Sequence, residues 1–303
     1  MNGALARLLV STPSLQPRLA AFERAAAADA PVLVLGEPGT GRSSLARALH
    51  AAGPRAEGPL VEFDAGAVPA ALFESELFGH RPGAFTGADR VHLGRVARAE
   101  RGTLLLDHVE ELPLAVQPKL LRLLAESRYA PLGGVDADAD VRFLAVGAAD
   151  LPQRIESGAF REDLFWRIEV LTFRLPPLRE RREDVLPLAE AMLADLAARF
   201  GRGSARLSDE ARRWLPEHPW PGNLRQLRNV LERALLGTDA EVVDPERPRG
   251  LGGAAPARSL VEVEIEAIRA ALAQSRGHQG RAAELLGISR KNLWEKRKRY
   301  GIP

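Results

Sequence analysis

The sequence predicts an α/β protein followed by a helical region and a small helix-turn-helix domain. Three observations support this fold class. Apolar runs alternate with helical patterns over residues 1–172, a glycine-rich loop follows the first run, and a basic helical pattern closes the chain. Alternation of this kind predicts a parallel sheet with helices on both faces.

Four apolar runs are expected to form the strands, at residues 31–36, 60–65, 102–109 and 141–148. They are continuous rather than alternating, which is typical of strands buried on both faces of a sheet. After about residue 172 the strand signal stops. We therefore place an α/β subdomain at residues 1–172.

Amphipathic helical patterns at residues 181–201 and 222–237 predict a helical subdomain over residues 173–237. Residues 238–258 are rich in Gly, Pro and Ala without periodicity, and are predicted to form a linker. Residues 259–303 carry a first helix and then a helix, a glycine-containing turn and a second helix, which predicts a helix-turn-helix domain.

Composition excludes several classes of protein. The 303 residues are 46% hydrophobic and 27% charged, with a net charge of +2, which describes an ordinary globular protein. No apolar stretch approaches the ~18 residues of a membrane span, so no membrane partner is expected. The chain has no cysteine, which excludes disulfides and thiolate metal sites and agrees with a cytoplasmic location. No cluster of His, Asp and Glu has metal-ligand spacing.

The stretch VLVLGEPGTGRSS, residues 32–44, has the spacing of a phosphate-binding P-loop. It follows an apolar strand and opens a helix, so its backbone N–H groups are expected to converge on phosphates. A glycine-rich turn without a ligand is the alternative. The residues expected to contact the nucleotide are Gly36, Glu37, Pro38, Gly39, Thr40, Gly41, Arg42, Ser43 and Ser44.

The stretch LLLDHVEEL, residues 104–112, is the second part of such a site. It is an apolar strand that ends in Asp107, which we expect to hold Mg²⁺ together with Ser43. The cofactors predicted from both stretches are ATP and Mg²⁺.

Three further blocks carry a resemblance to a known family. They are ESELFGHRPGAFTGADR at 74–90, FREDLFWRIEVLTFRLPPLRERREDV at 160–185 and WPGNLRQLRNVLERAL at 220–235. With them, residues 8–303 resemble the bacterial enhancer-binding proteins, the AAA+ activators of sigma-54 RNA polymerase, including their Fis-type helix-turn-helix. The resemblance implies an AAA+ P-loop NTPase fold with an α-helical lid, assembled as a ring, usually a hexamer, with ATP between neighbouring subunits.

The GAFTGA string is the most specific of these motifs. From the residues alone, an exposed phenylalanine between glycines predicts either a tight turn or a loop that contacts another protein. The resemblance implies that Phe85 and Thr86 contact sigma-54. The whole predicted contact is Gly83, Ala84, Phe85, Thr86, Gly87 and Ala88.

Three arginines match positions that act on the nucleotide in the family. Arg161 and Arg167 match the catalytic arginine fingers that reach a neighbour's γ-phosphate, and Arg225 matches the sensor arginine of the lid. Such fingers stabilise the charge of the phosphoryl-transfer transition state. Surface ion pairing is the alternative for all three.

The chain departs from the family pattern within the hydrolytic machinery. Arg42 replaces the P-loop lysine, His108 the glutamate that polarises water, and Ala148 the sensor asparagine. Asp64 stands where the family typically has an asparagine that holds this glutamate. One departure runs the other way, because Ser43 restores the general P-loop hydroxyl where the family usually has glutamate. Loss of one charge-stabilising group typically costs ~10²-fold in rate. We therefore expect ATP binding with severely weakened hydrolysis, although His108 remains a candidate catalytic residue beside Asp107.

The carboxyl-terminal helix, expected at 289–300, concentrates basic residues and predicts DNA binding. A solvated charged tail is the alternative. Residues in its first turn are expected at base edges, and later basic residues at phosphates. Trp294 is expected to pack beside the small core of the domain. The predicted DNA contacts are Ser289, Arg290, Lys291, Asn292, Lys296, Arg297 and Arg299.

Two functions from different classes remain open. The first is a regulator of sigma-54 transcription that binds a palindromic upstream site as dimers paired through a helix at 259–274. It would act as a homo-oligomer, from dimer to hexamer, or join a hetero-oligomer with an active relative. The alternative is a DNA-binding repressor or architectural protein whose AAA+ domain only oligomerises.

Overall fold

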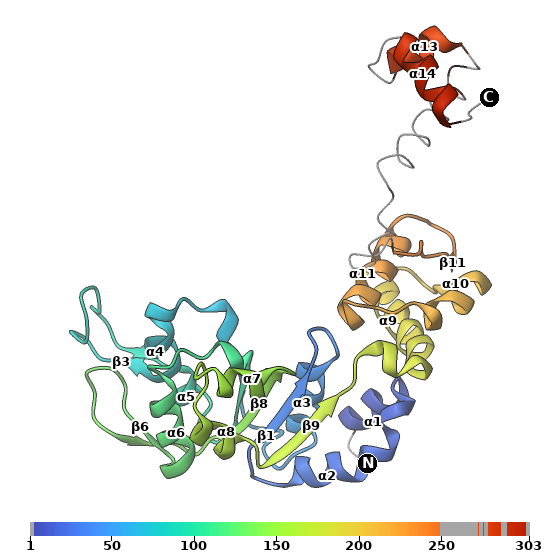
Figure 1. The fold of residues 1–303 in the computed structure, drawn as a ribbon. Coiled ribbons are helices and arrows are strands. Elements are labelled where there is room, and N and C mark those ends of the chain that lie inside the picture. The colour runs from blue at the N-terminus through green and yellow to red at the C-terminus, as the bar shows by residue number, and fades with distance from the viewer. Residues whose placement is uncertain (1–2, 249–271, 273–274, 276–277, 286–289, 301–303) are drawn as a thin grey trace. The chain divides into compact units, whose positions relative to one another are not determined.

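The computed structural model describes residues 3–248, 272, 275, 278–285 and 290–300 of the chain. They form two compact units, Met1–Arg247 and Pro248–Pro303. The first unit contains a sheet with its helices and a helical lid, and the second contains the helix-turn-helix (Figure 1).

The centre of the first unit is a five-stranded sheet in the order β2-β5-β8-β1-β9, with every neighbouring pair parallel (Figure 1). This confirms the predicted parallel α/β fold. Its strands are β1 (Val32–Gly36), β2 (Leu60–Asp64), β5 (Thr103–Asp107), β8 (Arg142–Ala148) and β9 (Leu171–Leu175).

The strand β9 was not among the four predicted runs. It lies at the edge of the sheet beside β1, where only Leu175 is buried, Arg174 is exposed and the other three residues are partly buried. Arg174 and Thr172 interrupt its apolar pattern, so no continuous run was present to predict it. The strand continues past residue 172, where the sequence placed the end of the α/β subdomain.

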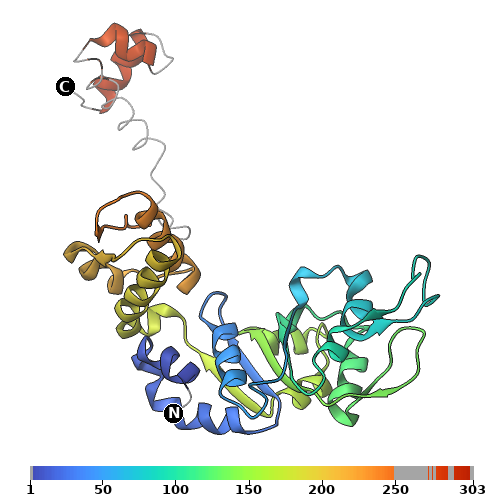
Figure 2. The same cartoon turned by 180° about the vertical axis from the view of Figure 1, so that it is seen from behind.

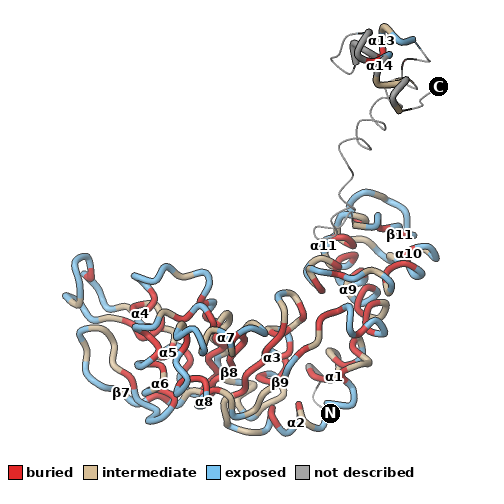
Figure 3. Tube along the Cα trace, viewed as in Figure 1, coloured by how far each residue is buried: buried red, intermediate tan, exposed pale blue. Residues whose placement is uncertain are grey.

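Helices cover both faces of the sheet, as the continuous apolar strands require. One face packs against α1, α2 and α3, and the other against α4, α6 and α8, and Figure 3 shows the buried residues following the strands and helices. The six helices are α1 (Gly3–Val10), α2 (Leu19–Ala27), α3 (Arg42–Ala51), α4 (Ala70–Phe78), α6 (Gln117–Glu126) and α8 (Glu162–Ile168). Short helices α5 (Arg95–Arg98) and α7 (Leu151–Glu156) complete the layers.

Two small hairpins extend from the sheet domain and lie side by side in both views (Figures 1 and 2). The first joins β3 (Gly79–His80) to β4 (His92–Leu93), and the second joins β6 (Arg128–Tyr129) to β7 (Ala137–Asp138). The Arg81 backbone N–H donates to the Leu132 carbonyl at 2.9 Å, so the two hairpins are hydrogen-bonded to each other.

The lid has its own core, built around the buried Trp214 and Trp220. Its helices are α9 (Val185–Arg199), α10 (Asp209–Trp214) and α11 (Asn223–Leu236), and its short strands are β10 (Arg206–Leu207) and β11 (Val242–Val243). The second strand lies in the segment predicted as a linker. Val243 is fully buried against this core, so the first part of residues 238–258 belongs to the lid, and residues 249–258 lie outside the described part.

The second unit contains α13 (Gln279–Leu285) and α14 (Arg290–Tyr300), at the predicted positions of the two helices. Ala282 and Leu293 are buried between them, whereas Trp294, predicted beside this core, is 55% exposed. The predicted pairing helix at 259–274 lies outside the described residues except for Leu272. Across the described residues, no helix has both the length and the apolar character needed to cross a membrane.

Candidate functional site

The phosphate loop lies at the carboxyl edge of the sheet, between the end of β1 and the start of α3. Gly39 and Gly41 have left-handed backbone angles, with φ of +79° and +101°, and Gly41 is the residue that caps α3. Such a backbone turns successive N–H groups toward one point, and the first N–H groups of a helix have no acceptor within it. The loop therefore fits a phosphate chain.

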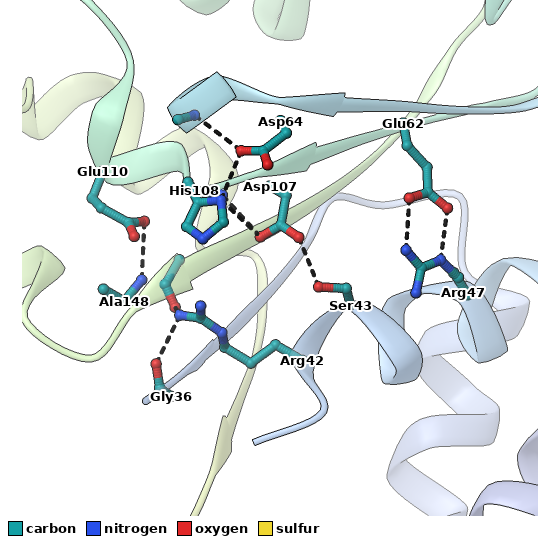
Figure 4. Close-up of polar contacts among 12 residues, drawn as sticks. Gly36, Arg42, Ser43, Arg47, Glu62, Asp64, Asp107, His108, Glu110 and Ala148 are labelled. Carbon is teal, nitrogen blue, oxygen red and sulfur yellow. Dashed lines mark hydrogen bonds and ion pairs between the residues drawn. The ribbon is translucent and has the colours of Figure 1, made fainter. Parts of the chain in front are cut away.

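The hydroxyl of Ser43 donates a hydrogen bond of 2.7 Å to Asp107 Oδ2 (Figure 4). The strand β5 thus brings this carboxylate to the loop, and the predicted binding of Mg²⁺ by the two residues stays a prediction. Hydroxyl and carboxylate oxygens are ligands that Mg²⁺ accepts, and in phosphate sites Mg²⁺ takes its other ligands from water and the phosphates. Among the described residues there is no group of three or more His, Cys, Asp or Glu side chains that could hold a metal ion.

The guanidinium of Arg42 is directed into the sheet edge. Its Nη1 donates to the Gly36 carbonyl at 2.7 Å and also to the Gly147 carbonyl, and the residue is only 5% exposed (Figure 4). Burial lowers the pKa of Arg42, and the negative charges of Glu110 and Asp107 oppose that change. The side chain predicted to contact the nucleotide is thus bonded to the ends of β1 and β8.

Glu110 is a site residue that the sequence reasoning missed. It lies in the short helix Val109–Glu111 that follows β5, and it is 7% exposed. Its Oε2 accepts a hydrogen bond from the Ala148 backbone N–H at 3.0 Å (Figure 4). A buried carboxylate therefore lies at the end of β8, where Ala148 has no polar side chain. The only indication of this carboxylate in the sequence was the pair of adjacent glutamates, Glu110 and Glu111, that follows DHV.

Two of the departures from the family pattern form a pair. A hydrogen bond of 2.7 Å joins His108 Nδ1 to Asp64 Oδ1, which also accepts from the Gly66 N–H at 3.0 Å (Figure 4). His108 has a left-handed backbone, with φ of +53°, and its own N–H donates to Asp107 Oδ1. The carboxylate of Asp64 thus fixes the orientation of the imidazole.

The lid contacts the loop through Asn223, a second residue that the sequence reasoning missed. This fully buried side chain donates to the Pro38 carbonyl at 3.1 Å and accepts from the Leu178 N–H at 2.7 Å. Beside it, the Leu224 N–H donates to the Gly39 carbonyl at 2.9 Å. The conspicuous turn sequence WPGN was the available signal.

Charged groups strengthen the contact between lid and loop. Arg179 donates to both carboxylate oxygens of Glu37, at 2.8 and 2.6 Å, and this pairing lowers the pKa of Glu37. The buried Arg181 donates to the Thr40 carbonyl. Arg225 lies next to Gly39, since a Cβ built on that glycine would come within 3.3 Å of the Arg225 Cβ. The predicted sensor arginine is therefore beside the loop.

The two predicted finger arginines are not brought to the phosphate loop of their own chain. Arg161 forms an exposed pair with Asp163 at 2.7 Å. Arg167 donates to the Leu124 carbonyl at 3.0 Å, and it shares a pocket with Arg142 at the start of β8, the opposite edge of the sheet. Their action on a neighbouring subunit stays a prediction.

The GAFTGA string forms the tip of the first hairpin. Phe85 is 43% exposed, and its ring packs edge-on against His80 with 4.9 Å between centroids. Gly83 and Gly87 have φ of +79° and +94°, and the Gly83 N–H donates to the Ala88 carbonyl at 2.8 Å. The loop therefore presents an aromatic ring and the exposed Thr86 to solvent.

The predicted DNA contacts lie on or next to α14. Arg290 is exposed at its start and packs over Gly280, where an added Cβ would lie 2.6 Å from the Arg290 Nη2. Lys296 and Arg297 are partly exposed. Lys291, Asn292 and Arg299 are described only as positions on this helix, and Ser289 lies outside the described residues.

The first unit combines a P-loop domain with a lid that is hydrogen-bonded to the loop, and it carries an exposed phenylalanine between glycines. Together with the helix-turn-helix, these features define an AAA+ protein with a DNA-binding domain. Comparison with known families agrees. Residues 8–174 match the sigma-54 interaction domain, residues 179–249 the AAA+ ATPase lid domain, and residues 259–300 the bacterial regulatory proteins of the Fis family. The chain belongs to the sigma-54-interacting AAA+ family with a Fis-type helix-turn-helix.

Individual relatives are similar over nearly the whole chain. The alginate biosynthesis transcriptional regulatory protein AlgB of Pseudomonas aeruginosa is 43% identical over 301 residues, covering 96% of this chain and 67% of AlgB. The DNA-binding transcriptional regulator NtrC of a Bradyrhizobium species is 39% identical, covering 95% and 68%. This chain therefore spans about two thirds of the length of these relatives.

Solved structures of NtrX from Brucella abortus share the fold. The complex with ATP has a TM-score of 0.71 and the complex with ADP one of 0.73, both at 31% identity and covering 95% of this chain and 68% of NtrX. These complexes support nucleotide binding in the family to which this chain belongs.

Replacing Asn223 with alanine is expected to lower the stability of the contact between lid and loop. Because the Leu178 N–H would lose its buried acceptor, the cost should be about 1–3 kcal/mol. Thermal unfolding followed by circular dichroism measures this effect. The matched control is Asn229→Ala on the same helix, where the side chain is exposed and the change should stay within about 0.5 kcal/mol. Equal destabilisation by both variants would contradict this assignment.

Proposed function

We propose that this chain is a sigma-54-dependent transcriptional regulator whose AAA+ domain binds Mg²⁺ and ATP but hydrolyses ATP poorly. The observation that carries the proposal is the placement of Arg42, whose guanidinium bonds to the strand-end carbonyls of Gly36 and Gly147. Phosphoryl transfer depends on positive groups that neutralise the developing charge. A guanidinium bonded to two carbonyl oxygens is a poor substitute for a lysine directed at phosphates.

The groups that would act on water support the same conclusion. His108 stands at the position of the polarising glutamate and is paired with Asp64 at 2.7 Å. Ala148 contributes only its backbone N–H, which is bonded to Glu110. Bound Mg²⁺ would polarise phosphate oxygens, and Ser43 and Asp107 are the residues that would hold it. The loop, the metal-binding pair and the lid contact thus favour binding, whereas the water-activating positions do not favour turnover.

The remaining parts support regulation rather than a solitary enzyme. Phe85 and Thr86 are exposed for contact with sigma-54, and the Fis-type domain would bind an upstream palindromic DNA site. The fingers Arg161 and Arg167 are directed away from the chain's own loop and would serve a neighbouring subunit. The chain would therefore act in the cytoplasm as a homo-oligomer, or with an active relative whose nucleotide it helps to hydrolyse.

Steady-state ATP turnover tests the proposal. A repaired variant carrying Arg42→Lys, His108→Glu and Ala148→Asn also needs Asp64→Asn, because a glutamate at 108 would otherwise face the Asp64 carboxylate. We expect the repaired protein to hydrolyse ATP about 10²-fold faster than the natural chain. Turnover by the natural chain at the rate of a folded repaired protein would overturn the proposal.

Capture of purified sigma-54 tests the contact loop. With a transition-state mimic of ATP bound, Phe85→Ala is expected to weaken capture about ten-fold or more, since exposed aromatic residues often dominate protein contacts. The folded state should be unaffected, because the ring is 43% exposed. Leu236→Ala removes another exposed apolar side chain, on the lid, and should leave capture unchanged. If the natural chain captures no sigma-54 but binds DNA, the alternative of a repressor that only oligomerises is favoured.

A further inference from the structure

We propose that the nucleotide site of this chain selects a nucleoside diphosphate over the triphosphate, and that Arg42 and Glu110 together produce this preference. The inference rests on the proposed function in one respect, namely that the loop at residues 36–44 binds a nucleotide. It goes further by naming which nucleotide state the site stabilises.

The first step concerns the positive charge that a triphosphate needs. In P-loop proteins the basic side chain of the loop attracts the β- and γ-phosphates. Here the Arg42 side chain passes into the sheet edge, and its Nη1 donates to the carbonyls that end β1 and β8. Breaking these bonds would leave two buried carbonyl oxygens without their donor. The cation is therefore withdrawn from the terminal phosphate.

The second step concerns negative charge at the same edge. Glu110 is buried, accepts from the Ala148 N–H at 3.0 Å, and is the acidic group with the largest electrostatic effect on Arg42. Asp107 and Asp64 end the neighbouring strands β5 and β2. The carboxylates of Glu110 and Asp107 thus lie near enough to act electrostatically on Arg42, whose hydrogen bonds go to the Gly36 and Gly147 carbonyls. An additional phosphoryl group increases the negative charge that this edge must accept.

The third step concerns what a diphosphate needs, which the chain retains. The left-handed Gly39 and Gly41 and the start of α3 supply backbone N–H groups that do not depend on Arg42. Ser43 and Asp107 are in place for a metal ion, at 2.7 Å from each other. Asn223 and the pair Glu37–Arg179 hold the loop against the lid. The backbone N–H groups and the metal-binding pair that serve the inner phosphates are retained, whereas the side-chain cation that the outer phosphate also needs is bonded to the sheet edge.

The test is equilibrium binding to the full chain by isothermal titration calorimetry in the presence of Mg²⁺. The two probes are ADP and a non-hydrolysable ATP analogue. We expect ADP to bind about ten-fold more tightly than the analogue. Equal or tighter binding of the analogue would overturn the proposal, and so would the absence of binding by both nucleotides.

Variants assign the preference to the named residues. Glu110→Gln is expected to tighten binding of the ATP analogue about five-fold or more while changing ADP affinity less than about two-fold. Glu111→Gln is the matched control, because its carboxylate is 48% exposed and bonds to Arg154 instead. The double variant Arg42→Lys with Glu110→Gln should abolish the preference. Equal effects of Glu110→Gln and Glu111→Gln would contradict the role of Glu110. Thermal unfolding shows whether each variant is folded.

Binding and turnover separate this inference from the proposed function. The ATP analogue is not hydrolysed, so its affinity is independent of the catalytic rate. Rapid ATP hydrolysis by the natural chain would overturn the proposed function and leave a measured preference for ADP standing. Slow ATP hydrolysis together with tighter binding of the analogue than of ADP would overturn the inferred preference for ADP and leave the proposed function standing.

Discussion

The bonds from the Arg42 guanidinium to the Gly36 and Gly147 carbonyls are the constraint on which the chemistry of this site depends. They join the ends of β1 and β8, two neighbouring strands, beneath the phosphate loop. An arginine is rarely deprotonated, so its charge has to be balanced where it is buried. The carbonyl oxygens and Glu110 provide that balance from within the protein. Because the Arg42 guanidinium is already hydrogen-bonded to these carbonyls, its positive charge contributes little to binding phosphates.

The other departures are consistent with this arrangement rather than independent losses. Asp64 and His108 satisfy each other, and Glu110 occupies the Ala148 N–H at the end of β8. The side chains of Asp64 and His108 and the backbone N–H of Ala148 are thus hydrogen-bonded within the protein itself. The loop nevertheless keeps its shape, because Asn223 and Arg179 hold it from the lid. A site that binds nucleotide without rapid turnover is the expected result.

Much of the fold was predictable, because buried parallel strands and amphipathic helices leave strong patterns in the sequence. The half-exposed edge strand β9 left no such pattern, and β11 is a strand of two residues inside a segment rich in Gly and Pro. In the site, motif spacing predicted the meeting of Ser43 with Asp107. It did not predict the direction of the Arg42 side chain or the role of Glu110, because these depend on which carbonyl and N–H groups the folded strand ends present. The pairing of Asp64 with His108 likewise joins residues far apart in the chain.

A crystal structure of the full chain with Mg²⁺ and ADP tests the central claim most directly. The account predicts that the Arg42 guanidinium remains hydrogen-bonded to the carbonyls of Gly36 and Gly147 while the loop N–H groups bind the phosphates. A guanidinium turned out of the sheet edge and bonded to phosphate oxygens would contradict it.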